Sequence, residues 1–236
     1  MGSDLPKVAH PVAGEPMATW VVRACRAAGC DRIIIVVGYR RDTVRASLAG
    51  EPAVEFVEQQ EQLGTGHAVQ QARPVLDGFT GDVLILAGDG PLIRGESLRR
   101  LVEHHRTTGS AATLATAEVD DPAGYGRILR DPSGSFLGVV EHANATDEQR
   151  AIREINPSVY CFRANDLFTA LDRVGRDPAS GEFYLTDAPA VLAGSGARID
   201  AVRSLSAEEA LSINTPTQLA EVDAILRARQ SRAGAV

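Results

Sequence analysis

Two short, fully apolar runs that each end at a glycine constrain the fold of this chain most strongly. Ile33–Val37 is β-branched throughout and precedes Gly38, and residues 83–86 (Val-Leu-Ile-Leu) precede the sequence Ala-Gly-Asp-Gly. Continuous apolar runs of this length are typical of strands that are buried on both faces of a parallel sheet. We therefore predict two buried strands. Open α/β sheets bind ligands beyond the carboxyl ends of such strands, so we expect a site there.

Helical patterns alternate with these strands. Apolar residues at positions 17, 20, 21, 24, 25 and 28 mark one face of a helix that Gly29 can end. We predict further helices at 41–49, 66–76, 96–107, 166–174, 184–194 and 217–229, and further strands at 54–57, 112–119, 126–130, 136–141, 159–163 and 198–202. This order predicts an α/β fold with a doubly wound, mostly parallel sheet. We expect one domain over residues 1–230 and a disordered tail over 231–236.

The composition argues against several classes of function. The 236 residues include 24 Lys and Arg and 31 Asp and Glu, and the net charge of −7 disfavours nucleic acid or an anionic membrane as a partner. Three scattered cysteines indicate reduced thiols in a cytoplasmic protein. No apolar run approaches the roughly 18 residues that a membrane span needs. The histidines lack zinc spacing, and we expect His104 and His105 on a solvated helix face. The sequence has neither a Walker loop nor a Gly-x-Ser-x-Gly turn.

A few polar residues stand where chemistry could occur. Asp89 follows a predicted strand between two glycines, where a carboxylate could hold Mg²⁺ against substrate phosphates, although a turn-forming aspartate has the same pattern. The Gly-rich residues 62–68 lead into a helix and could contact an anion or a base edge, although a helix cap at Thr65 explains them as well. Lys7 follows Pro6 and is either a phosphate ligand or a solvated side chain.

A larger set of segments stands in an order that one family shares. They are Ser3-Asp4-Leu5-Pro6-Lys7-Val8, Glu61-Gln62-Leu63-Gly64-Thr65-Gly66-His67-Ala68, Gly88-Asp89 with Pro91-Leu92, Asp121-Pro122 with Gly124-Tyr125-Gly126-Arg127-Ile128, Val140-Glu141-His142, Glu154-Ile155-Asn156 and Gly181-Glu182-Phe183-Tyr184-Leu185-Thr186-Asp187. Together they cover nearly the whole chain. In this set the chain resembles the N-acetylglucosamine-1-phosphate uridyltransferases, the pyrophosphorylase half of the bifunctional bacterial enzyme that makes UDP-N-acetylglucosamine.

The resemblance implies a Rossmann-like nucleotidyltransferase fold and a role for each matching residue. The implied catalytic residues are Lys7, on the substrate phosphates, and Asp89, which with Asn214 binds Mg²⁺. The implied substrate-binding residues are Gln59, Gly64 and Thr65 at the uracil end, Gly88, and Gly126, Glu141 and Asn156 in the sugar pocket. The implied reaction transfers UMP from UTP to N-acetylglucosamine 1-phosphate and releases pyrophosphate. A sugar phosphate is largely ionised at pH 7, with a second pKa near ~6, so it needs no general base.

The chain departs from the family pattern at several places. The family's signature loop, Leu-x-x-Gly-x-Gly-Thr-x-Met, would end at Met1, so we expect the first strand and the phosphate loop to be missing, unless the true start lies upstream. The family's C-terminal β-helix is also missing, and we expect a monomer. Ala87, Ala143-Asn144 and Pro157-Ser158 replace the usual residues of the base and sugar pockets. Two alternatives therefore stay open: a related enzyme for another sugar 1-phosphate, and an impaired remnant that only binds sugar nucleotides.

Overall fold

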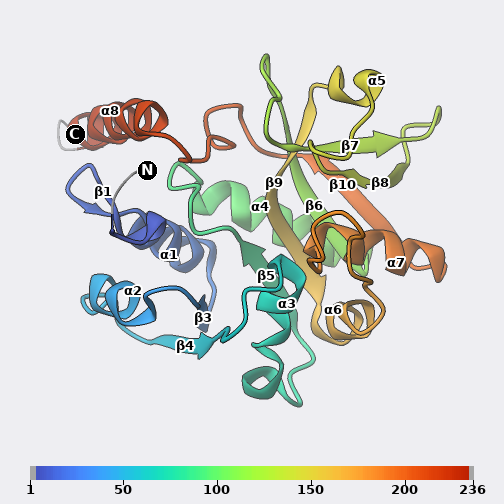
Figure 1. Cartoon of the computed structure of the whole chain (residues 1–236), viewed down its shortest axis with the longest axis horizontal. Helices are drawn as coiled ribbons and strands as arrows, with labels where there is room; N and C mark the ends of the chain where they lie inside the picture. Colours follow the sequence, from blue (N-terminus) through green and yellow to red (C-terminus); the bar gives the residue numbers. More distant parts are fainter. Residues whose placement is uncertain (1–3, 234–236) are drawn as a thin grey trace.

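The computed structural model describes residues 4–233. The helices are α1 (Met17–Ala28), α2 (Arg41–Ser47), α3 (Thr65–Gln70), α4 (Gly95–Thr108), α5 (Asp147–Arg150), α6 (Ala164–Leu171), α7 (Ala188–Gly194) and α8 (Pro216–Ala233), with 3-10 turns η1 (Lys7–Ala9), η2 (Arg73–Leu76) and η3 (Leu185–Asp187). The strands are β1 (Pro11–Val12), β2 (Glu15–Pro16), β3 (Ile33–Val37), β4 (Val54–Glu58), β5 (Asp82–Leu86), β6 (Ala112–Glu118), β7 (Gly126–Arg130), β8 (Phe136–Val140), β9 (Glu154–Arg163) and β10 (Ile199–Arg203). Figure 1 shows their arrangement.

The α/β class is confirmed, and the strand pairing is more mixed than we expected. β3 and β4 form a two-stranded parallel sheet, and β10 pairs in parallel with β6 in the larger sheet. β5 and β6 both pair antiparallel with β9, and β7 pairs antiparallel with β8 and β9. The expected mostly parallel pairing is therefore corrected. The reason is that β9 follows the β7–β8 hairpin and returns between β5 and β6, which themselves run in the same direction.

β9 is longer than the predicted strand because it continues across an interruption. The sequence predicted a strand only at 159–163. In the structure the pairing with β6 shifts register between Ala115 and Ala117, and Ser158 has a positive φ of 59°. The chain therefore bulges at Pro157-Ser158 and resumes pairing at Ile155. The result places Asn156 inside the sheet, at the edge of the site described below.

α1 packs against other elements on two sides. Met17, Val21 and Ala24 of the predicted face are buried, and Gly29 ends the helix in the left-handed region with φ 94°. Ala18 and Val22 pack on the β3–β4 side, in the same cluster as Ile33 and Val37. A separate cluster joins Val12 and Met17 to Ile213, Val222 and Leu226, so α8 packs beside β1. This packing brings η1 and the loop before α8 close to the loop after β5.

Two local expectations are corrected by the described residues. Residues 231–233, which we expected in a disordered tail, continue α8, while 234–236 lie outside the described residues, as do Met1 and Ser3. His105, which we expected on a solvated face, is 1% exposed and points into the protein. None of the described helices is long and apolar enough to cross a membrane.

Candidate active site

Three side chains from distant parts of the chain meet beyond the carboxyl end of β5. Lys7 lies in η1, Asp89 in the loop after β5, and Asn214 in the loop between β10 and α8. The Lys7 ammonium contacts the Asp89 carboxylate and lies 2.5 Å from Asn214 Oδ1. The Ile213 N–H donates to the Asp89 carbonyl oxygen at 3.0 Å, which ties the two loops together. The cluster lies where open α/β sheets bind ligands.

The oxygens of this cluster fit a hard divalent cation. Magnesium takes one or two protein oxygens and completes its octahedron with water and substrate phosphates. Asp89 and Asn214 supply one carboxylate and one amide oxygen, and both already face a cation, the Lys7 ammonium. No group of three or more His, Cys, Asp or Glu side chains in residues 4–233 is arranged to hold a metal. A substrate-completed site is therefore the kind of metal site that these two residues could form.

Lys7 is the only lysine of the chain, which otherwise uses arginine for its positive charges. Lysine carries a compact ammonium, whereas arginine carries a planar fork that binds bidentately. The Lys7 side chain is about one-third exposed, so it can reach solvent and a bound phosphate from its present position. Gly88 lets η1 approach this closely, because a Cβ at Gly88 would lie 3.1 Å from Val8 Cγ1.

The residues assigned to the uracil end form a second cluster around the start of α3. Gln59 Nε2 donates to the Gly64 carbonyl oxygen at 3.1 Å and contacts His67 Nδ1 at 3.0 Å. Gly64 has φ 102° and ψ 177°, and the 182–185 segment packs directly against it. Thr65 is the first residue of α3 and not its cap, since its hydroxyl accepts a bond from the Leu185 N–H at 3.0 Å. Two backbone bonds also hold the Gly-rich loop, from Phe183 N to Leu63 O and from Gly66 N to Phe183 O, both at 2.8 Å.

The three residues assigned to the sugar pocket also lie together. Gly126 and Asn156 are direct partners across β7 and β9, and a Cβ at Gly126 would lie 3.6 Å from Glu141 Oε2. Asn156 Nδ2 donates to the Tyr160 hydroxyl at 2.6 Å, which fixes the orientation of its amide. Burial raises the pKa of Glu141, and a hydrogen bond from the Thr186 hydroxyl at 2.9 Å opposes this rise.

The sequence did not single out every residue that lies at these clusters. Thr186 and Asp187 end the motif that begins at Gly181. The Thr186 hydroxyl bonds Glu141, and burial raises the pKa of Asp187. Tyr125 and Ser212 join the sugar and cation clusters through a hydrogen bond between the Ser212 N–H and the Tyr125 hydroxyl at 3.2 Å. The motif Gly-Tyr-Gly-Arg drew attention to Tyr125, whereas no local pattern marks Ser212.

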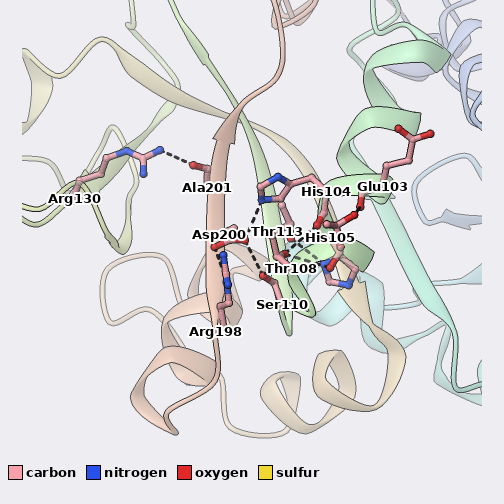
Figure 2. Close-up of polar contacts among 11 residues, drawn as sticks. Glu103, His104, His105, Thr108, Ser110, Thr113, Arg130, Arg198, Asp200 and Ala201 are labelled. Atoms are coloured by element: carbon pink, nitrogen blue, oxygen red, sulfur yellow. Dashed lines mark hydrogen bonds and ion pairs between the residues drawn. The ribbon is translucent and has the colours of Figure 1, made fainter.

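A further polar cluster on α4, β6 and β10 is structural in its contacts (Figure 2). Asp200 accepts bonds from Ser110 Oγ at 2.9 Å and Arg198 Nε at 3.2 Å, and it lies 3.0 Å from His104 Nε2. His105 Nδ1 lies 2.9 Å from Thr113 Oγ1, and burial lowers its pKa. These contacts join a helix to two strands, so they account for the His104-His105 pair without a ligand.

Two solved structures share the architecture of this chain. A crystal structure of UDP-glucose pyrophosphorylase complexed with UDP-glucose superposes with a TM-score of 0.71 and 15% identity over 95% of this chain and 91% of that one. A crystal structure of apo UDP-glucose pyrophosphorylase gives a TM-score of 0.74 and 15% identity over 96% and 92%. At this level of identity the likeness shows the fold alone, which is a Rossmann-like α/β fold shared with these two structures.

The family follows from the sequence comparisons. The model of the MobA-like NTP transferase domain matches residues 1–184, and the chain belongs to this family. It is 47% identical over 232 residues to the bifunctional protein GlmU of Geobacter metallireducens, covering 98% of this chain and 49% of the relative. It is also 47% identical over 229 residues to the bifunctional protein GlmU of Syntrophotalea carbinolica, covering 97% and 49%. The resemblance inferred from the motifs is confirmed, and the chain spans about half the length of these relatives.

Proposed function

We propose that this chain is a uridylyltransferase that joins UTP and N-acetylglucosamine 1-phosphate into UDP-N-acetylglucosamine and releases pyrophosphate. The observation that carries the proposal is the meeting of Lys7, Asp89 and Asn214 beyond β5, in a chain 47% identical to relatives named bifunctional protein GlmU. We also propose that the enzyme is a cytoplasmic monomer whose ligands are small phosphorylated molecules, without nucleic acid or membrane.

The chemistry needs alignment and charge neutralisation more than proton transfer. The nucleophile is an oxygen of the sugar 1-phosphate, which is largely ionised at neutral pH. It attacks the α-phosphorus of UTP, the bond from that phosphorus to the bridging oxygen breaks, and pyrophosphate leaves. Mg²⁺, held by Asp89 and Asn214, would supply positive charge beside the reacting phosphates when bound. Lys7 adds a positive charge at the same place and can follow the phosphate as charge develops.

The other two clusters supply the two ends of the substrate. Gln59, Gly64 and Thr65 present main-chain and amide groups for the uracil edge. Glu141 and Asn156, beside Gly126, present an acceptor and an amide for sugar hydroxyl and acetamido groups. Leu185 and Thr186 join these clusters, because the Leu185 N–H bonds Thr65 and the Thr186 hydroxyl bonds Glu141. The two clusters are therefore connected through adjacent residues of one segment.

A substitution at Asp89 tests the assignment of the metal site. Removal of a preorganised electrostatic group typically costs about 10²–10³-fold in kcat, so we expect Asp89→Asn to lower UTP-dependent pyrophosphate release by at least about 100-fold. Asp77→Asn is the matched control, because Asp77 is exposed and lies outside the three clusters. Release by Asp89→Asn at the wild-type rate would remove Asp89 from the mechanism.

A different sugar is the second candidate, and the bulge in β9 favours testing it. Ser158, with φ 59°, lies two residues after Asn156, and Pro157-Ser158 stand where the family usually has Thr-Gly. A panel of sugar 1-phosphates, assayed for pyrophosphate release with UTP, separates the two candidates. A higher kcat/KM for a sugar without an acetamido group would favour the second. Binding of UDP-N-acetylglucosamine without turnover of any sugar would favour a binding remnant.

A further inference from the structure

We propose that Ser212 and Tyr125 are positioning residues that hold the side-chain amide of Asn214 with its oxygen toward the cation site. The proposal deepens the function proposed above and rests on it. It concerns a hydrogen-bonded chain of three groups: the Asn214 amide, the Ser212 hydroxyl and the Tyr125 phenol. Neither Ser212 nor Tyr125 contacts the site oxygens directly, so each would act through Asn214.

A chain of hydrogen bonds leads from the cation site to Tyr125, the residue before β7. Asn214 Oδ1 accepts from Lys7 Nζ at 2.5 Å, and the other end of the same amide, Nδ2, donates to Ser212 Oγ at 3.2 Å. Ser212 in turn donates to the Tyr125 hydroxyl twice, from its backbone N at 3.2 Å and from Oγ at 3.3 Å. The amide is thus held at both ends, one by the cationic side chain and one by the serine.

The orientation of this amide matters because its two ends have nearly the same shape and opposite chemistry. The oxygen can bind a cation, whereas the NH₂ group presents two hydrogens and repels one. Asn214 is exposed, so packing does not select between the two orientations. Its backbone N–H is held by Gln218 Oε1 at 2.8 Å, which fixes the main chain but leaves the side-chain torsion free.

Ser212 becomes the remaining constraint once a phosphate attracts Lys7. While Lys7 contacts Oδ1, the ammonium and Ser212 both favour this orientation, so the loss of either one loosens the amide. A substrate phosphate that draws the ammonium away removes that preference at the time when the oxygen is needed for a cation. The acceptor lone pairs of Ser212 Oγ then keep the NH₂ group on the far side. Ser212 would therefore orient the metal ligand without itself contacting the cation.

Tyr125 is a firm support for Ser212. Its carbonyl oxygen accepts a bond from Arg127, whose side chain is 1% exposed, and its ring packs against the core cluster that contains Ile155 and Val159. Tyr125 also precedes Gly126 of the proposed sugar pocket. Tyr125 therefore connects the sugar cluster to the cation cluster, and the residues of these two clusters are far apart in sequence.

The single lysine allows a test that needs neither metal nor turnover. In protein labelled with [¹⁵N]lysine, one side-chain NH₃⁺ signal reports on Lys7. We expect Ser212→Ala to move this signal toward its position in Asn214→Ala, because the partner of the ammonium is no longer fixed. Ser231→Ala is the control, since Ser231 bonds only its own helix at the Arg227 carbonyl. A Lys7 signal unchanged by Ser212→Ala would overturn the proposal.

Mn²⁺ binding in the presence of UTP, whose phosphates complete the site, is followed by electron paramagnetic resonance and tests the role toward a cation. Loss of one hydrogen bond predicts about fivefold weaker binding in Ser212→Ala and in Tyr125→Phe, with Tyr39→Phe unchanged. Asn214→Asp should abolish the effect of Ser212→Ala, because a carboxylate has two equivalent oxygens and needs no orientation. Equal weakening in both backgrounds, wild-type affinity in Ser212→Ala, or no Mn²⁺ binding by the wild type would each overturn the proposal. Mn²⁺ binding without pyrophosphate release would instead count against the proposed function alone.

Discussion

Gly64 is the position where one added methyl group should have the largest effect on this fold. Its φ of 102° and ψ of 177° lie in a region that only glycine occupies readily. A Cβ there would also lie 2.6 Å from the Phe183 carbonyl oxygen, and 2.9 Å from both Phe183 N and Glu182 Cβ. Two of these three atoms belong to the backbone, so no rotation of a side chain can relieve the contact. Gly64→Ala therefore combines strained torsions with a collision.

The two costs can be added approximately. The torsions of Gly64 cost a non-glycine residue about 1–3 kcal/mol. Relief of the collision requires Phe183 to move away, which stretches the 2.8 Å bonds from Phe183 N to Leu63 O and from Gly66 N to Phe183 O. Each such bond contributes about 1 kcal/mol. We therefore expect Gly64→Ala to lower the free energy of unfolding by about 3–5 kcal/mol.

Gly109→Ala separates the two costs. Gly109 ends α4 in the left-handed region with φ 65° and ψ 26°, and a Cβ there would meet nothing within 4 Å. This substitution should cost about 1–2 kcal/mol, from the torsions alone. The measurement is urea unfolding followed by circular dichroism for the wild type and both variants. A loss for Gly64→Ala no larger than that for Gly109→Ala would show that the close approach of Phe183 is not a constraint.

Two further predictions follow from the buried carboxylates. Burial raises the pKa of Glu154, but hydrogen bonds from Arg130, Thr116 and Arg203 outweigh it and hold this pKa at about 2, below its ordinary 4.5. Ionised Glu154 therefore stabilises the folded state by about 3 kcal/mol. Because the folded pKa is the lower one, this stabilisation is complete above pH 4.5 and disappears as the pH falls toward 2. The free energy of unfolding of Glu154→Gln should therefore lie below that of the wild type at pH 7, and by a smaller difference at pH 3. Glu55→Gln, at an exposed ion pair, is the control. An equal difference at both pH values would contradict the assignment. Burial raises the pKa of Glu141 above 4.5, so it takes up a proton at a higher pH than an ordinary glutamate. The KM for the sugar phosphate should consequently rise as the pH falls through that raised pKa, and Glu141→Gln should remove this pH dependence; a variant that keeps it would exclude Glu141 as its origin.

The sequence predicted elements best where a local pattern decides the structure. The β-branched run gives β3 with both ends correct, and Gly29 ends α1 as expected. The prediction fell short where distant partners decide. β9 continues through Pro157-Ser158 because β6 and β7 pair with residues on the far side of the bulge. His105 is buried against β6, where its Nδ1 lies 2.9 Å from Thr113 Oγ1, and nothing in the helical pattern shows this.

The candidate site divides in the same way. Asp89 could be placed by the strand-end rule, and the resemblance supplied Lys7 and Asn214, which the structure then brings together with it. Ser212 could not be found from the sequence, because its role depends on a loop that lies against Tyr125 from another part of the chain. Side chains that act through a second residue leave no local pattern, and only the folded structure identifies them.

We propose above that Lys7, Asp89 and Asn214 act in uridylyl transfer to a sugar phosphate. The most direct measurement is ³¹P NMR of the purified chain with UTP, Mg²⁺ and N-acetylglucosamine 1-phosphate in which the phosphate oxygens carry ¹⁸O. We expect UDP-N-acetylglucosamine with ¹⁸O in the bridge between its two phosphorus atoms, together with unlabelled pyrophosphate, because the sugar phosphate attacks the α-phosphorus. No diphosphate product from the folded chain, or label in the pyrophosphate, would contradict it.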